Sequence, residues 1–286
     1  MKELGFFDGE FINLDETKVS LEDRGYQFGD GIYEAAKVYN GKCFALDRHL
    51  ERCIRSLREL QIPVTYTNDE LTAIHEDIIA KSQINDGVIY FQITRGTAPR
   101  THFFPDKVVP HLSMTIRPSL VHEDWQTSGI QTLWAEDIRW LRCDIKTINL
   151  LGNVLAKQKA HAKGFHEAIQ FRKDTNLVTE GSSSNFFIVK DDIIWTHPLN
   201  NLILKGITRS ILLEECAPQL GLTVVEKAFT PEFAAGADEA FVTSTSLEVT
   251  PVISISGKKI GHGVPGKITK QLLAAYKALV KADCYR

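Results

Sequence analysis

A polar, irregular stretch at residues 118–124 divides the chain, and runs typical of strands and helices lie on both sides of it. Before it, residues 88–93 are rich in β-branched and aromatic side chains, which is typical of a strand. After it, residues 150–163 carry apolar side chains at helical spacing and end at a glycine. The sequence therefore predicts two domains of mixed helices and strands, residues 1–118 and 125–286, joined by a linker at 119–124.

Further elements follow from the same patterns. A hairpin is predicted around the turn at residues 7–10. The amphipathic run 46–62 predicts a helix capped by Asp47, with Arg48, Arg52 and Arg55 on its solvated side. In the helix at 150–163 we expect Leu151, Val154, Leu155 and Ala162 to point inward. The remaining expected helices cover residues 68–82, 207–216 and 265–281, and the remaining expected strands cover 110–117, 129–135, 167–172, 186–189 and 193–196.

The bulk composition excludes several classes of protein. A net charge of −3 argues against nucleic acid as a partner, because nucleic-acid-binding proteins usually carry a basic excess. No apolar run approaches the ~20 residues of a membrane span. The five cysteines are odd in number and form no C-x-x-C pair, so we expect reduced thiols, a cytoplasmic protein and no metal site.

Lys146 is the first candidate for chemistry. It lies between Ile145 and Ile148 and runs into Leu150 and Leu151, where an exposed ammonium group gains nothing. Burial disfavours the ammonium form, so a lysine held there offers a neutral amine. Only the neutral amine has the lone pair that attacks an aldehyde to form a Schiff base. The alternative is a lysine that packs its stem on apolar surface and keeps its head group in water.

Polar groups suited to anions occur in several other segments. Arg100 and His102 fall on one side of an extended segment, which fits equally a carboxylate or phosphate receptor and two solvent-facing loop residues. Gly206 precedes a predicted helix, whose first N–H groups favour a phosphate. Residues 241–246 end a predicted strand in four consecutive hydroxyls. Glu180 lies in a polar loop predicted at 178–185. Each of these, taken alone, also fits an ordinary cap, turn or strand end.

Taken together, these segments resemble one family. Residues 23–34, 49–52, 95–102, 137–151, 180–185, 204–209 and 241–245 match the fold-type IV pyridoxal-phosphate enzymes in family order, and most resemble their D-amino-acid aminotransferase branch. The resemblance implies a two-domain α/β (α+β) fold with a smaller N-terminal domain, a larger C-terminal domain, and pyridoxal 5'-phosphate (PLP) at their interface.

The resemblance also implies roles for the cofactor residues. Lys146 would form the Schiff base with PLP. Glu180 would face the pyridine nitrogen, because a carboxylate keeps that nitrogen protonated and the ring able to withdraw electrons. The other implied cofactor contacts are Arg52, Leu204, Ile207, Thr208, Ser244 and Thr245.

For the substrate, the resemblance implies that Tyr33, Arg100 and His102 hold the α-carboxylate. Arg100 and His102 would come from the neighbouring subunit of a homodimer. The implied reaction is transamination between a D-amino acid of the D-alanine type and a 2-oxo acid, either 2-oxoglutarate or pyruvate. The alternatives are a branched-chain L-aminotransferase and an aminodeoxychorismate lyase, which share the lysine and glutamate but lack the Arg-x-His pair, and a non-catalytic PLP-binding protein.

Overall fold

The computed structural model describes residues 2–15 and 19–285 and divides into two compact units. The first unit comprises Met1–Leu120, Ile145–Asn149 and Val280–Arg286, and the second comprises Val121–Asp144 and Leu150–Leu279. The segment that carries Lys146 thus belongs to the first unit, although its neighbours along the chain on both sides belong to the second. The domain limits 1–118, 119–124 and 125–286 stay a prediction.

The first unit is built on an antiparallel sheet with the strand order β2-β1-β6-β5-β3-β4 among its described residues. Its strands are β1 (Leu4–Phe7), β2 (Glu10–Ile12), β3 (Gly31–Tyr39), β4 (Lys42–Cys43), β5 (Gly87–Thr94) and β6 (His111–Pro118). The predicted hairpin is confirmed, because β1 and β2 pair around Asp8 and Gly9, whose φ angles are 44° and 104°. The strands predicted at 88–93 and 110–117 are confirmed as β5 and β6.

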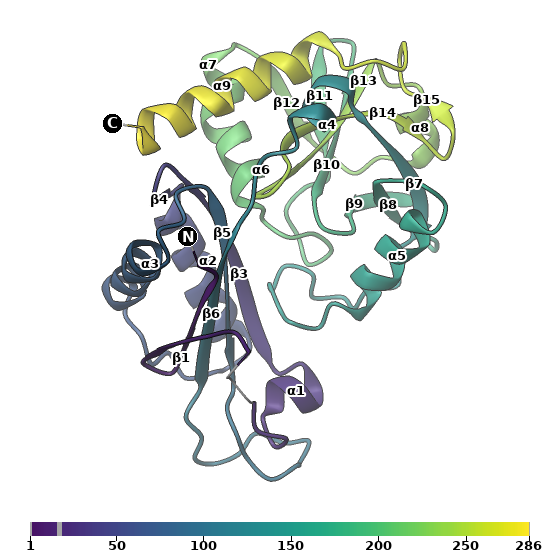
Figure 1. Ribbon diagram of the computed structural model, residues 1–286. Helices are drawn as coiled ribbons and strands as arrows, with labels where there is room; N and C mark the ends of the chain where they lie inside the picture. Colours follow the sequence, from purple (N-terminus) through teal and green to yellow (C-terminus); the bar gives the residue numbers. More distant parts are fainter. Residues whose placement is uncertain (1, 16–18, 286) are drawn as a thin grey trace. The chain divides into compact units, whose positions relative to one another are not determined.

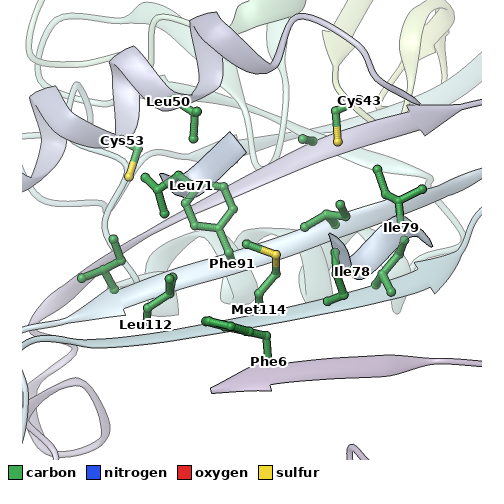
Figure 2. Packing of buried hydrophobic residues seen from close by; sticks show 14 of the residues in the cluster. Phe6, Cys43, Leu50, Cys53, Leu71, Ile78, Ile79, Phe91, Leu112 and Met114 are labelled. Carbon is green, nitrogen blue, oxygen red and sulfur yellow. The ribbon is translucent and has the colours of Figure 1, made fainter. Parts of the chain in front are cut away.

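Two helices lie against one face of this sheet, α2 (Leu46–Glu59) and α3 (Asn68–Ser82), and a short helix α1 (Arg24–Phe28) precedes β3 (Figure 1). Figure 2 shows the core between them, where Leu50 of α2 and Leu71 and Ile78 of α3 meet Phe91 and Met114 of the sheet. Helix α3 begins at a capping box in which Thr67 and Glu70 satisfy each other's backbone N–H groups. The prediction that Asp47 caps α2 is wrong: the cap position is Ala45, with no side-chain hydrogen bond.

The second unit contains a mixed sheet with the order β12-β11-β10-β13-β14-β7-β8-β9, in which β15 pairs with β14. The β11/β12, β14/β7 and β7/β8 pairs are parallel and the other pairs are antiparallel. The strands are β7 (Ile130–Glu136), β8 (Glu167–Arg172), β9 (Leu177–Gly181), β10 (Asn185–Lys190), β11 (Ile193–Thr196), β12 (Thr223–Glu226), β13 (Glu239–Ser244), β14 (Glu248–Ile255) and β15 (Lys258–Lys259). The mixed α/β fold class is confirmed.

The helical segments of the second unit are α4 (Glu123–Ser128), α5 (Leu151–His161), α6 (Ile207–Ile211), a π-helical turn η1 (Leu212–Cys216), α7 (Ala217–Gln219), α8 (Pro231–Ala235) and α9 (Lys267–Cys284), whose last turns belong to the first unit. The helices predicted at 150–163, 207–216 and 265–281 are therefore confirmed as α5, α6 with η1, and α9.

Two predictions for the second unit are wrong. The loop expected at 178–185 begins as strand β9, because its backbone pairs with β8, and Glu180 lies in that strand. The inward face expected of α5 points outward: Leu151, Val154 and Leu155 are 72%, 55% and 50% exposed, and Ala162 is exposed as well. Instead Ala156 and Ala160 are buried against β7 and β8, since small side chains let the helix approach the sheet closely.

Among the described residues, no helix is both long and apolar enough to cross a membrane. Within the same residues, no cluster of histidine, cysteine, aspartate or glutamate side chains could bind a metal ion.

Candidate functional site

Lys146 is fixed through its backbone in the first unit. Its N–H donates to Ser56 Oγ at 3.4 Å, and its carbonyl accepts from the Tyr33 N–H at 3.0 Å. Ile145 is buried and Ile148 is half-buried, as the sequence predicts. The lysine side chain is itself half-buried, and its Nζ lies 4.2 Å from the centroid of the Tyr33 ring. The segment therefore holds an amine over an aromatic ring and leaves it accessible to small molecules.

Tyr33 connects this amine to the sheet. It lies on β3, directly before Glu34, and its ring stacks on Tyr90 of β5 with centroids 5.5 Å apart. Burial, with a further contribution from Tyr33, raises the pKa of Tyr90 to about 12, so Tyr90 stays a neutral phenol that donates to Gln92 at 2.8 Å. The Tyr33 ring thus has one fixed neighbour and the Lys146 amine as another.

The prediction that Arg52 lies on the solvated side of α2 is wrong. It is buried, and its Nε and Nη2 donate to the two carboxylate oxygens of Glu34 at 2.7 and 2.8 Å. His49 Nδ1 lies 2.8 Å from the same carboxylate. Burial alone would raise the pKa of Glu34, but Arg52 and His49 outweigh it and hold that pKa well below its ordinary value. Glu34 is therefore ionised and fixes the guanidinium in one orientation.

Arg100 and His102 lie in the loop between β5 and β6, and both are exposed. The Arg100 Cζ is 4.8 Å from the centroid of the Phe28 ring, and the His102 ring is 5.7 Å from it. Because both side chains contact one ring, they lie on the same side of the loop. An anion at this position could therefore contact both the Arg100 guanidinium and the His102 imidazole.

Glu180 is buried in the second unit and has several donors. Arg139 Nη1 donates to Oε1 at 2.6 Å, Asn185 Nδ2 donates to Oε2 at 2.8 Å, and the Leu204 N–H lies 3.2 Å from Oε2. Burial raises the pKa of Glu180 above its ordinary value, and the neighbouring Arg139 opposes this by favouring the carboxylate. The three donors thus fix the orientation of the Glu180 carboxylate, and Arg139 also influences its protonation.

Arg139 and Asp137 form one ion-pair network with Glu180, and the sequence predicts a role for neither of them. Arg139 Nη2 donates to Asp137 Oδ2 at 2.8 Å, so one guanidinium joins Asp137 to Glu180. Asp137 also accepts from Thr179 Oγ1 at 2.8 Å, and its pKa is below the ordinary value because the hydrogen bonds from Arg139 and Thr179 outweigh burial. The only sequence signal was a D-x-R pair just before the Lys146 stretch.

The start of α6 and the end of β13 provide the groups expected for a phosphate. Gly206 is the cap position of α6, and the first N–H groups of a helix have no intrahelical acceptor. A Cβ at Gly206 would overlap Asn185 Oδ1, so a larger residue there would have to displace the Asn185 side chain. The buried hydroxyls of Ser210 and Thr243 find no hydrogen-bond partner within the described chain. Unused donors of this kind fit a group with several acceptor oxygens.

The other predicted cofactor residues surround these positions. Ile207 and Thr208 begin α6, and Leu204 precedes it and is half-buried. Ser244 ends β13, Thr245 follows it, and both are half-buried. Ser244 Oγ accepts from the Leu247 N–H at 3.1 Å, which fixes the turn after the strand. Within the second unit, the segments before α6 and after β9 come together through Asn185, which also donates to the Leu204 carbonyl at 2.9 Å.

The chain is similar to known proteins both in sequence and in fold. The family model described as amino-transferase class IV matches residues 31–255. D-alanine aminotransferase from Staphylococcus haemolyticus is 47% identical over 279 residues, covering 97% of this chain and 98% of the relative. D-alanine aminotransferase from Bacillus licheniformis is 44% identical over 277 residues, with 97% of each chain covered. The crystal structure of the Escherichia coli branched-chain amino acid aminotransferase superposes with a TM-score of 0.92 at 26% identity, covering 98% of this chain and 95% of that one.

Proposed function

The chain belongs to the amino-transferase class IV family, and we propose that it transfers the amino group between a D-amino acid of the D-alanine type and a 2-oxo acid. The observation that carries this proposal is the identity of 44–47% with D-alanine aminotransferases over nearly the whole chain. The Arg100-Thr101-His102 loop supports the same assignment, because it presents two anion-binding side chains on one side of Phe28. The branched-chain relative resembles the chain at a much lower identity.

PLP is the cofactor of this family, and when bound it withdraws electrons from the carbon that carries the substrate amino group. Lys146 would hold it covalently through Nζ. Glu180 would accept a hydrogen bond from the protonated pyridine nitrogen, and Arg139 favours the carboxylate form of Glu180 against the effect of burial on its pKa. The phosphate would be bound by Arg52, by the N–H groups of Ile207 and Thr208, and by Ser244 and Thr245, while Leu204 would pack on one face of the ring.

The reaction needs a proton to move at the substrate Cα. Lys146 Nζ would serve as the base that removes the proton from the substrate Cα and as the acid that returns it. The first substrate would leave as its 2-oxo acid, and a second 2-oxo acid (2-oxoglutarate or pyruvate) would receive the amino group. Tyr33, Arg100 and His102 would fix the α-carboxylate. The enantiomer that reacts follows from this placement. The carboxylate ligands fix one substituent of the substrate Cα, Lys146 fixes the face from which the proton leaves, and one direction remains for the substrate side chain.

A homodimer completes this proposal, with Arg100 and His102 serving the neighbouring subunit. The outward apolar face of α5, made by Leu151, Val154 and Leu155, supports it, since a contiguous exposed apolar surface is typical of a protein interface.

We also propose a cytoplasmic location, which is supported by five cysteines that all carry free thiols.

The test of the function is to mix the purified holoenzyme with D-alanine and separately with L-alanine, and to follow the visible absorbance of the cofactor. We expect only D-alanine to change it, and Lys146→Ala to abolish both turnover with 2-oxoglutarate and borohydride labelling. Turnover of L-isoleucine in place of D-alanine would support the branched-chain alternative. Release of pyruvate from aminodeoxychorismate without an oxo acid would support the lyase, and a spectrum unchanged by every amino acid would support a non-catalytic binder.

A further inference from the structure

Arg24 is a buried arginine to which neither the resemblance nor the comparisons assign a role. It is the first residue of α1 and is 2% exposed. Its Nε donates to Asp30 Oδ2 at 2.8 Å, and its Nη1 donates to the carbonyl of Thr101 at 2.7 Å. Thr101 is the residue between Arg100 and His102. The guanidinium therefore joins a carboxylate before β3 to the backbone of the loop that carries both proposed carboxylate ligands.

Phe28 adds a second connection between Arg24 and this loop. The Cζ atoms of Arg24 and Arg100 each lie 4.8 Å from the centroid of the Phe28 ring. The His102 ring packs against the same phenyl group at 5.7 Å and 56°. Contacts of guanidinium groups with an aromatic ring are attractive and restrict both side chains. Arg24 thus holds the main chain between Arg100 and His102, and Phe28 contacts both of their side chains.

Asp30 is itself fixed by a second arginine. Arg95 donates to Asp30 through Nε at 2.7 Å and Nη2 at 3.0 Å. Its guanidinium also donates to the carbonyls of Leu60 and Gln61 after α2, at 2.7 and 2.8 Å. Arg24 and Arg95 therefore share the Asp30 carboxylate. Both arginines are almost fully buried, so breaking their ion pairs with Asp30 costs free energy. The network therefore restricts the position of the loop at Thr101.

We propose that Arg24 is a positioning residue for the substrate carboxylate: by holding the Thr101 carbonyl and the Phe28 ring, it sets the positions of Arg100 and His102. This rests on the proposed D-amino-acid transamination and on the carboxylate role of Arg100. Lysine cannot replace it, because a single ammonium group lacks the planar fork that reaches Asp30 and Thr101 together and covers an aromatic face.

The experiment measures kcat and KM of the holoenzyme for D-alanine and for 2-oxoglutarate in Arg24→Lys and Arg24→Met. Both substrates carry the α-carboxylate, so we expect both KM values to rise about tenfold while kcat changes less than about threefold, which is the signature of lost substrate binding. The cofactor absorbance and Tm of Arg24→Lys should stay close to those of the wild type. The matched control is Arg117→Lys, an arginine of the same unit that is 61% exposed and 3.5 Å from Glu3, and it should change neither constant.

A double-mutant comparison separates positioning from a purely structural role. Arg100→Met should raise both KM values, and adding Arg24→Lys to it should raise them by less than about threefold more, because the two residues act on the same interaction. Unchanged KM values in Arg24→Lys, or a fall in kcat alone, would overturn the inference. Equal, additive effects in both backgrounds would also overturn it. If Arg24→Met does not fold, Arg24→Lys decides. Failure of the wild type to use D-alanine would instead refute the proposed function.

Discussion

Replacement of Arg139 by methionine should destabilise the second unit strongly. Methionine keeps most of the buried stem and removes the charge that joins Asp137 to Glu180. The side chains of Arg139, Asp137 and Glu180 are 6%, 0% and 6% exposed, so water cannot replace the guanidinium effectively. Removal of one partner from a buried ion pair costs about 3–5 kcal/mol.

Two features of the structure favour the lower end of that range. Asp137 keeps a second arginine, because Arg172 Nε lies 3.4 Å from its Oδ2. Glu180 keeps its hydrogen bonds from Asn185 and from the Leu204 N–H. We therefore expect a loss of about 3 kcal/mol, which for a unit of this size corresponds to a fall in Tm of about 6–12 °C.

The assay is thermal and urea unfolding of the cofactor-free protein, with Arg142→Met as the matched control. Arg142 lies in the same segment and pairs with Asp144 at 3.0 Å, but its side chain is 43% exposed. A pair that is so accessible to water contributes about 0–1 kcal/mol. Arg139→Met should consequently lower the Tm by several times as much as Arg142→Met.

The loss should also depend on pH in a defined direction. In the wild type the pKa of Asp137 is below its ordinary value, so its stabilising contribution is present above the unfolded pKa and is lost as the pH falls through the folded one. Without Arg139, the pKa values of both carboxyls rise, and protonation at low pH relieves the unpaired charge. The difference between wild type and variant should therefore be largest near about pH 7.5 and smaller near about pH 5. A difference below about 1 kcal/mol at the higher pH, or one that grows on acidification, would refute the reasoning.

Two further predictions concern the second unit. Gly206→Ala should weaken PLP binding about tenfold, because the added Cβ overlaps Asn185 Oδ1 at the start of α6. Titration of the protein with PLP, followed by absorbance, measures the dissociation constant. The control is Gly236→Ala, whose Cβ would meet its nearest atom at 3.6 Å. Leu155→Glu should convert the proposed dimer to monomer in sedimentation analysis, because it places a charge on the apolar face of α5. Val264→Glu, at another exposed apolar position, should leave the dimer intact. A dimer that survives Leu155→Glu would exclude α5 from the interface.

Local signals in the sequence were sufficient for most elements. Helix α3 begins and ends where predicted, because Thr67 and Glu70 form a capping box before an amphipathic run. Strand β5 was equally clear from its β-branched and aromatic residues. Helix α5 was found, but its buried side was predicted incorrectly. Hydrophobicity alone favours leucine and valine as the buried residues, whereas close approach to β7 and β8 requires the small side chains of Ala156 and Ala160.

The candidate site was less accessible to sequence reasoning, because its charges are balanced by residues far away along the chain. Arg52 resembled a solvated residue of an amphipathic helix. Its partner Glu34 lies 18 residues earlier on β3, and helical periodicity carries no information about that strand. In the same way, the partner of Glu180 is Arg139, 41 residues earlier. The family resemblance pointed to Arg52 and Glu180 themselves, and their partners became visible only in the structure.

A common arrangement explains why these partners matter. Arg52 is held by Glu34, Glu180 by Arg139, and the loop of Arg100 by Arg24. In each case a group proposed to meet the cofactor or the substrate is oriented before either arrives, so binding requires little reorganisation of charge. The partner contributes to function without touching a ligand. A guanidinium released from its partner turns toward water, and a released carboxylate turns toward water or becomes protonated. Substitution of the partners should therefore alter affinity for PLP or for the carboxylate while every contacting residue is still present.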